Sequence, residues 1–178
     1  MKIGSFEIYA PNTGMFKLDG GAMFGTVPKT IWERSIPPDA QNRIPMALRI
    51  IVVKDLVSKR NFIVDTGIGT KWSDKLAQIY AIDHTKETLD SALSSCGLNV
   101  TDITDVILTH LHFDHAGGAT RWDQAKVAVP QFPNATYYIQ KDNFDWATRP
   151  NSREAASYLP ENFMPLKEAG KLVVCDGQ

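Results

Sequence analysis

The stretch of the chain with the clearest potential for chemistry is Thr109–Gly118, which reads Thr-His-Leu-His-Phe-Asp-His-Ala-Gly-Gly. Three of the four histidines of the chain and one aspartate fall between His110 and His115. Imidazoles two residues apart on an extended segment point to the same side, so His110 and His112 can bind one cation. Asp114 and His115 follow a turn and can face a second cation. Nitrogen and carboxylate ligands favour zinc, with manganese, iron or cobalt as alternatives.

Two divalent ions at this place would have a defined chemical use. Ions about 3.5 to 4 Å apart that share a water generate hydroxide near neutral pH and polarise the bond to be cleaved. Asp114 would hold the second ion and accept a proton from the attacking water, which makes it the candidate catalytic residue. A single histidine would indicate a helix cap or a solvated loop, but three at this spacing favour a metal site.

At these residues the chain resembles the metallo-β-lactamase superfamily, whose signature is His-any-His-any-Asp-His after a strand. Residues 110–115 match that signature at every fixed position. Residues 61–67, Asn-Phe-Ile-Val-Asp-Thr-Gly, are similar to the family's earlier strand that ends in Asp-Thr-Gly. The resemblance implies that Asp65 supports the metal ligands from behind. It also implies an α+β fold, the four-layer αββα sandwich, of which this chain covers about the amino-terminal half.

The resemblance further implies a metal-dependent hydrolase. We expect a dinuclear zinc-type site that activates water to cleave an ester, a lactone, a thioester or a phosphotriester. A phosphodiesterase or nuclease of the same superfamily is one alternative, which salt-dependent RNA binding would favour. A metal-binding fragment without turnover is the other alternative.

The substrate pocket is predicted from an apolar, glycine-rich segment, residues 15–32. It lies where the family places a loop over the mouth of the active site, and it resembles the lactonase and organophosphate-hydrolase branch. Met23 and Phe24 are therefore candidates for an apolar pocket that binds an acyl or aryl group. Ordinary core packing is the alternative for each of these residues. Asp19 is a further candidate for a position near the metals.

Length and composition fit a soluble globular protein, and the resemblance implies a small-molecule substrate. The chain has 178 residues, 43% of them hydrophobic, and a formal net charge of −1. This balance gives no electrostatic footprint for nucleic acid or an anionic membrane, so we expect neither partner. The sequence also lacks a run typical of a signal peptide or a membrane span, which predicts a cytoplasmic location. Cys96 and Cys175 are expected to be free buried thiols, and His84 a solvated loop residue.

Residues 1–178 are expected to form one domain in which strands and helices alternate. The first expected feature is a hairpin of residues 3–10 and 15–19, followed by a loop over 20–45. The further expected strands are 46–54, 61–65, 105–109, 135–140 and 171–175, the last beginning another hairpin. The expected helices are 72–81, 86–96 with Thr85 as N-cap, 141–148 and 153–159.

The resemblance covers only part of the ligand set. Relatives supply another histidine for each metal and a bridging aspartate from further downstream, whereas no histidine follows His115 here and Asp176 lies in a turn-like sequence. A catalytic zinc ion usually has three protein ligands and an open position. We therefore expect the domain to be incomplete at its carboxyl end, as the amino-terminal part of a longer hydrolase. Taken alone, its uncovered apolar faces would allow a homodimer.

Overall fold

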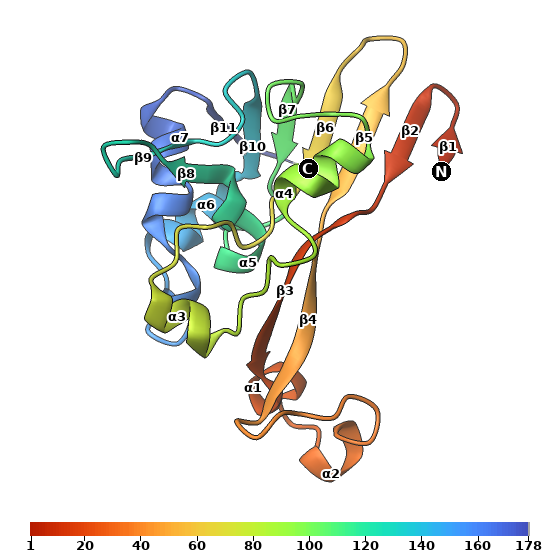
Figure 1. The fold of residues 1–178 in the computed structure, drawn as a ribbon. Helices are drawn as coiled ribbons and strands as arrows, with labels where there is room; N and C mark the ends of the chain where they lie inside the picture. Colours follow the sequence, from red (N-terminus) through yellow and green to blue (C-terminus); the bar gives the residue numbers. More distant parts are fainter. Residues whose placement is uncertain (178) are drawn as a thin grey trace.

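The computed structural model describes residues 1–177 of the chain, which combine one large sheet, two small strand pairs and short helices (Figure 1). The strands are β1 (Lys2–Ile3), β2 (Phe6–Tyr9), β3 (Asn12–Asp19), β4 (Arg43–Arg49), β5 (Ile51–Asp55), β6 (Asn61–Val64), β7 (Asp105–Ile107), β8 (Thr120–Trp122), β9 (Ala128–Pro130), β10 (Thr136–Gln140) and β11 (Leu172–Cys175). The α-helices are α1 (Gly20–Phe24), α2 (Lys29–Trp32), α3 (Asp74–Ile79), α4 (Leu89–Ser95), α5 (Phe113–Ala116), α6 (Lys141–Thr148) and α7 (Met164–Glu168).

The large sheet is mixed and has the order β1-β2-β5-β6-β7-β10-β11. Strands β1, β2, β5 and β6 pair antiparallel, whereas β6, β7, β10 and β11 pair parallel. Because parallel strands need a crossover, helical segments separate them along the chain. A mixed sheet with helices outside it confirms the predicted α+β class.

One face of the large sheet carries the main core. Val52, Ile63, Val106 and Tyr137 are fully buried there, and helices α4, α6 and α7 contribute apolar side chains to the same cluster. Since side chains alternate across a strand, the next residue of each strand points to the opposite face. Burial on one face thus fixes the register that brings the end of β7 next to the end of β6.

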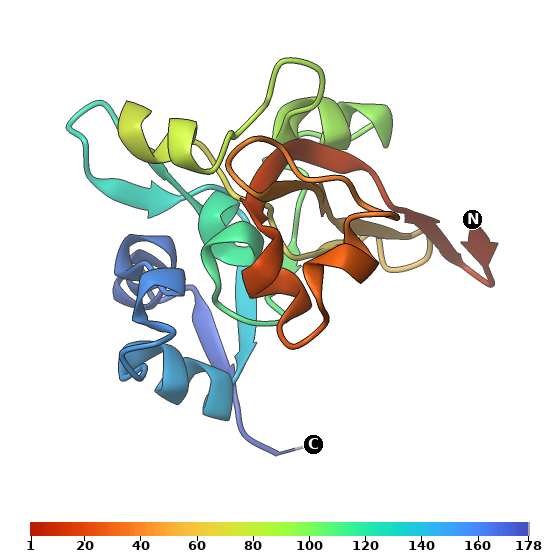
Figure 2. The same cartoon turned by 90° about the horizontal axis from the view of Figure 1, so that it is seen from below.

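A second, smaller core joins the β3–β4 hairpin to the rest of the molecule. The hairpin projects from the large sheet and carries α1 and α2 at its far end, as the two views show (Figures 1 and 2). Phe16 and Leu48 of this hairpin pack with Ile68 and Phe113. The hairpin is therefore anchored to α5, which belongs to the histidine motif.

Several expected elements differ from the structure. Residues 15–19 do not pair with residues 3–10; β3 pairs with β4, whereas β2 pairs with β5. The N-cap of α4 is Thr88, whose hydroxyl accepts from Ser91 N, and not Thr85. Residues 153–159 form only a short 3₁₀ turn over 155–157. Strand β11 continues the sheet parallel to β10 and begins no hairpin among the described residues.

Two side chains outside the motif also correct the sequence interpretation. Both cysteines are free, but only Cys96 is buried, because Cys175 lies at the end of the edge strand β11 and is exposed. His84 is half-buried, with Nδ1 3.0 Å from Thr13 O and Nε2 3.2 Å from Gly69 O. It links two chain segments and is not a solvated loop residue. Within residues 1–177, none of the helices has the length and apolar character needed to cross a membrane.

Candidate metal centre

The histidine motif is held between the two cores of the molecule. Strand β7 ends at Ile107, and the chain then turns into the motif. Leu111 is fully buried in the main core, whereas Phe113 is buried in the second core. The ring of Phe113 packs edge-on against Trp72, with 5.4 Å between ring centroids. Burial of Leu111 and Phe113 in the two cores thus restricts the orientation of the histidines beside them.

The three imidazoles of the motif lie together. The ring centroid of His110 is 4.6 Å from that of His112 and 4.0 Å from that of His115. Asp114 lies beside them, with Oδ2 3.5 Å from His115 Nε2. All four predicted metal ligands line one cavity of about 330 Å³, which we call the histidine cavity.

Asp65 forms hydrogen bonds with Thr109 and His115 of the motif segment. Its Oδ1 accepts from Thr109 N at 2.8 Å, and its carboxylate also accepts from the Thr109 hydroxyl. Its Oδ2 is 2.8 Å from His115 Nδ1. Asp65 is nearly buried and has a left-handed backbone with φ of 60°. A carboxylate held on this strained turn orients the imidazole of His115 so that Nε2 faces the histidine cavity.

The free ring nitrogens fit a cation. Asp65 occupies Nδ1 of His115, and the Thr109 hydroxyl lies 3.0 Å from Nδ1 of His110. Among residues 1–177, Nε2 of neither ring forms a hydrogen bond, and Asp114 Oδ2 lies 3.5 Å from Nε2 of His115. The Nε2 atom of His112 is buried and has no hydrogen-bond partner among the described residues. A buried nitrogen without a partner is destabilising unless something binds it. The donor set is therefore suited to a divalent metal ion.

The protonation of the imidazoles agrees with this use. Burial, together with the neighbouring imidazoles, lowers the pKa of His110, and burial lowers the pKa of His112. Burial also acts on His115, but the hydrogen bond to Asp65 and the charge of Asp114 outweigh it and raise the pKa of that ring. His110 and His112 are thus held in the neutral form that metal ligation requires.

The four predicted ligands lie close together but do not have ligating geometry in this structure. Among residues 1–177, no three side chains of the His, Cys, Asp and Glu types are arranged so that they could hold a metal ion between them. The four motif residues therefore have to adjust their side chains to share an ion.

Residues 66–67 hold the backbone of the motif in place through hydrogen bonds. Thr66 donates through both its amide and its hydroxyl to His115 O, at 2.8 Å each. Gly118 N donates to Gly67 O at 2.9 Å. A Cβ on Gly118 would lie 2.2 Å from Thr66 O, so only glycine allows the two segments to approach this closely.

Replacing Gly118 with alanine should therefore destabilise the protein. Overpacking against backbone costs about 3 kcal/mol, which lowers the thermal midpoint by about 6 to 12 °C for a chain of this size. Gly4→Ala is the control, because Gly4 has a positive φ but open space around it, and about 1 kcal/mol is expected there. Calorimetry that finds Gly118→Ala no worse than Gly4→Ala would contradict the close-contact argument.

Lys71 ties the same two segments together. Its ammonium donates to the carbonyls of Gly117 and Thr120. Burial lowers the pKa of Lys71 to about 8, from 10.5.

The unfolded chain therefore binds more protons at this site than the folded chain between about pH 8 and pH 10.5. Stability rises with pH wherever the unfolded state holds more protons. Denaturant titrations across this range should show that the unfolding free energy of the wild type increases relative to that of Lys71→Met. A difference between the two proteins that stays constant from pH 7 to pH 10.5 would contradict this assignment.

The predicted pocket residues separate in the structure. Met23 lines the histidine cavity, whereas Phe24 stacks on Trp32 with 4.9 Å between ring centroids. Asp19 caps α1 by accepting from Ala22 N at 2.8 Å, and it does not line the histidine cavity. Leu18, which belongs to the apolar segment 15–32 from which the pocket was predicted, lines the cavity as well. Met46 and Tyr80 also line it, and the sequence did not single out either of them.

Tyr158 is a further residue that the sequence did not mark. Its ring lies 4.7 Å from the ring of His112, measured between centroids, and it is almost fully buried. It comes more than forty residues after the motif, in the segment that follows the 3₁₀ turn at 155–157. No local pattern connects it with the histidines, so only the fold reveals this contact.

Comparison with known proteins decides the family. Residues 50–165, well over half of the chain, match the family described as "Metallo-beta-lactamase superfamily". The chain belongs to the metallo-β-lactamase superfamily. Members of this superfamily characteristically bind divalent metal ions, which agrees with the donor set described above.

Three proteins to which this superfamily member is similar are described as hydrolases or lactonases. A "probable metal-dependent hydrolase from Staphylococcus aureus" is 34% identical, with a TM-score of 0.83, over 99% of this chain and 61% of that chain. The dizinc quorum-quenching lactonase AidC is 25% identical, with a TM-score of 0.70, over 99% of this chain and 60% of that chain. N-acyl homoserine lactonase AttM from Agrobacterium fabrum is 28% identical over 71 residues, 40% of this chain and 23% of that protein. The chain thus spans about three fifths of the solved relatives.

Proposed function

We propose that this chain carries the amino-terminal metal ligands of a dinuclear zinc-type hydrolase. His110, His112, Asp114 and His115 would be the ligands, with manganese, iron or cobalt as alternatives to zinc. The observation that carries the proposal is the buried Nε2 of His112, which has no hydrogen-bond partner in the described part of the chain and lies in a cluster of three imidazoles. The name of AidC, a dizinc lactonase, supports two zinc ions.

The proposed reaction is hydrolysis of an ester, a lactone or a related bond in a small molecule. Divalent ions, when bound, supply Lewis-acid activation of water and of the bond to be cleaved. Asp114 reaches the histidine cavity, where its carboxylate would orient the water and accept its proton. Asp65 would keep the ring of His115 in one orientation through its hydrogen bond to Nδ1.

The apolar side of the histidine cavity supports an acylated substrate. Leu18, Met23 and Met46 of the β3–β4 hairpin and α1, together with Tyr80, face the same cavity as the motif. Apolar walls with a few polar groups are typical of sites for small organic ligands. AidC and AttM are lactonases by name, so an acylated lactone is the substrate class that we propose first.

We also propose that residues 1–178 are part of a larger domain whose remainder covers the second face of the large sheet. In-register pairing places Ile51, Val64, Ile107, Tyr138 and Val173 in one row across five strands. Three of these apolar residues, one each on β5, β7 and β11, are 41 to 43% exposed. An apolar sheet face requires a covering layer. A homodimer through this face is the alternative when the chain stands alone.

Light scattering of the purified chain, with and without Ile107→Lys, tests the uncovered face. We expect concentration-dependent association that the lysine reduces, because a charge in an apolar contact is unfavourable. A wild type that stays monomeric at high concentration would contradict self-association through this face.

A cytoplasmic location and the absence of nucleic-acid and membrane partners remain predictions from the sequence.

The hydrolase proposal is tested by incubating zinc-loaded protein with N-acyl homoserine lactones and following acid release. The assay uses the 178-residue chain and, where the gene encodes more residues, the longer protein. Turnover that requires zinc and disappears in His112→Ala is expected from the protein with a complete ligand set, with Asp142→Asn as the control. Equal turnover by the wild type and His112→Ala would overturn the assignment.

A further inference from the structure

A second cavity lies apart from the histidine motif, and it is larger than the histidine cavity. It has a volume of about 410 Å³, within the range of small-molecule sites, and we call it the threonine cavity because five threonines line it. The five are Thr13, Thr66, Thr70, Thr88 and Thr120. None of the four motif residues at positions 110, 112, 114 and 115 lines it. It is therefore separate from the site proposed above.

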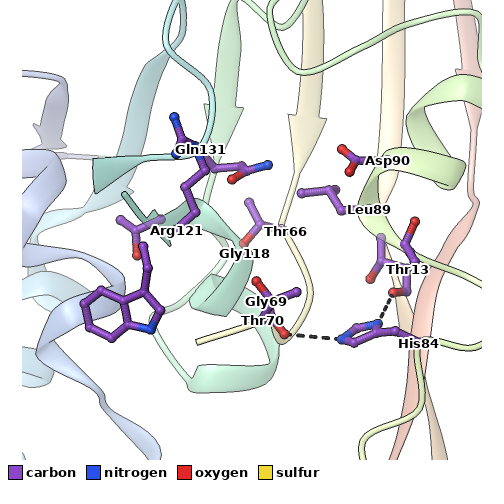
Figure 3. A pocket seen from close by; sticks show the side chains of 13 residues that line it. Thr13, Thr66, Gly69, Thr70, His84, Leu89, Asp90, Gly118, Arg121 and Gln131 are labelled. Carbon is purple, nitrogen blue, oxygen red and sulfur yellow. Dashed lines mark hydrogen bonds between the residues drawn. The ribbon is translucent and has the colours of Figure 1, made fainter. Parts of the chain in front are cut away.

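Hydrogen bonds hold the wall of the threonine cavity in place. His84 closes one side, because its two ring nitrogens contact Thr13 O and Gly69 O, as the dashed lines show (Figure 3). The hydroxyl of Thr13 donates to Leu48 O at 3.0 Å, and that of Thr120 donates to Glu161 O at 2.7 Å. These wall groups have hydrogen-bond partners within the protein, so the wall does not depend on a ligand.

Two charged side chains of opposite sign, Arg121 and Asp90, lie on the rim, where both are exposed to solvent. Arg121 and Gln131 lie together on one side of the threonine cavity, and Asp90 lies with Leu89 on the other (Figure 3). Neither Arg121 nor Asp90 takes part in any of the ion pairs found within residues 1–177. Thr66 and Gly118 lie between the two sides. A ligand that carries one charge only would leave the opposite rim charge unmatched.

We propose that the threonine cavity binds a small zwitterion with a carboxylate at one end and an ammonium at the other. The carboxylate binds the guanidinium of Arg121, helped by the amide of Gln131, since planar Arg–carboxylate pairing is the strongest match available here. The ammonium binds the carboxylate of Asp90. The connecting chain contacts Leu89 and the indole of Trp122, which supply the apolar part of the wall.

The bound zwitterion would also touch the support of the metal motif. Thr66 belongs to the threonine cavity, and its hydroxyl donates to His115 O. Gly118 of the same wall donates its amide to Gly67 O. Amide signals of these two residues therefore report occupancy of the threonine cavity in the interior of the protein.

Titrations with ω-amino acids test the proposal. The metal-free 178-residue chain is titrated with glycine, 4-aminobutyrate and 6-aminohexanoate, while two-dimensional amide NMR spectra are recorded. Hexanoate and hexylamine are the matched probes with one charge each. We expect at least one of the three zwitterions to shift the amide signals of Thr66, Leu89 and Gly118 saturably. Hexanoate and hexylamine should each bind at least about tenfold more weakly than that zwitterion.

Variants separate the proposed contacts from general surface binding. Arg121→Gln and Asp90→Asn should each weaken binding of that zwitterion by about tenfold. Arg34→Gln, which alters an exposed arginine outside the threonine cavity, should leave the affinity unchanged. The proposal is overturned if no zwitterion shifts these amides at millimolar concentration, if hexanoate or hexylamine binds as tightly, or if Arg121→Gln binds like the wild type.

Discussion

Replacing His112 with alanine is expected to weaken zinc binding by this chain more than 100-fold. Loss of an outer hydrogen bond to a metal ligand already weakens metal sites by about 10- to 100-fold, and loss of the ligand itself removes more. His112 is the informative position because its Nε2 is buried and has no partner among the described residues. Competition with a chromophoric chelator near neutral pH measures the affinity.

The fold should survive this change. His112 contacts the ring of Tyr158, but Leu111 and Phe113 on either side of it are the residues that enter the two cores. We therefore expect circular dichroism and the thermal midpoint of His112→Ala to remain close to those of the wild type. A folded His112→Ala protein that binds zinc with wild-type affinity would show that this imidazole is not a ligand.

The Asp65→Asn substitution is the second change with a large expected effect, a loss of about 10- to 100-fold in zinc affinity. Asparagine keeps the size of the side chain, and it tolerates the left-handed backbone that Asp65 adopts. It also retains an oxygen that can accept from Thr109. What it removes is the negative charge at His115 Nδ1, and with it the preference for the tautomer that presents Nε2.

Asp142→Asn is the matched control for Asp65→Asn. Asp142 is an exposed aspartate in the first turn of α6 and lies outside the histidine cavity. Its replacement should change neither zinc affinity nor the midpoint of unfolding by a measurable amount. Equal zinc affinities for Asp65→Asn, Asp142→Asn and the wild type would mean that the hydrogen bond to His115 has no role in metal binding.

The histidine motif and Asp65 can be recognised in the sequence because both are local patterns at the ends of strands. His110 and His115 follow β7, and Asp65 follows β6, so the parallel pairing of these two strands brings the three side chains together. The apolar spacers Leu111 and Phe113 could be recognised only as part of the motif. Their assignment to two different cores depends on the β3–β4 hairpin, which the sequence analysis paired differently.

Two of the errors, the pairing of β3 and the environment of His84, share a physical cause, which is contact between residues distant in sequence. Strand β3 was expected to fold back on β2, but the polypeptide passes on to a second sheet and pairs with β4 after the α1–α2 segment. Strands β8 and β9 are three residues each, too short for a periodic pattern. His84 had no local signal, because its contacts are with Thr13 and Gly69.

Zinc titration of the purified 178-residue chain, prepared metal-free, tests the central claim most directly, which is that residues 110–115 form a metal site. Calorimetry should give at least one zinc ion per chain for the wild type, and the binding signal should be lost when His110, His112 and His115 are all replaced by alanine. Zinc binding that is absent in the wild type, or unchanged in the triple variant, would contradict the claim.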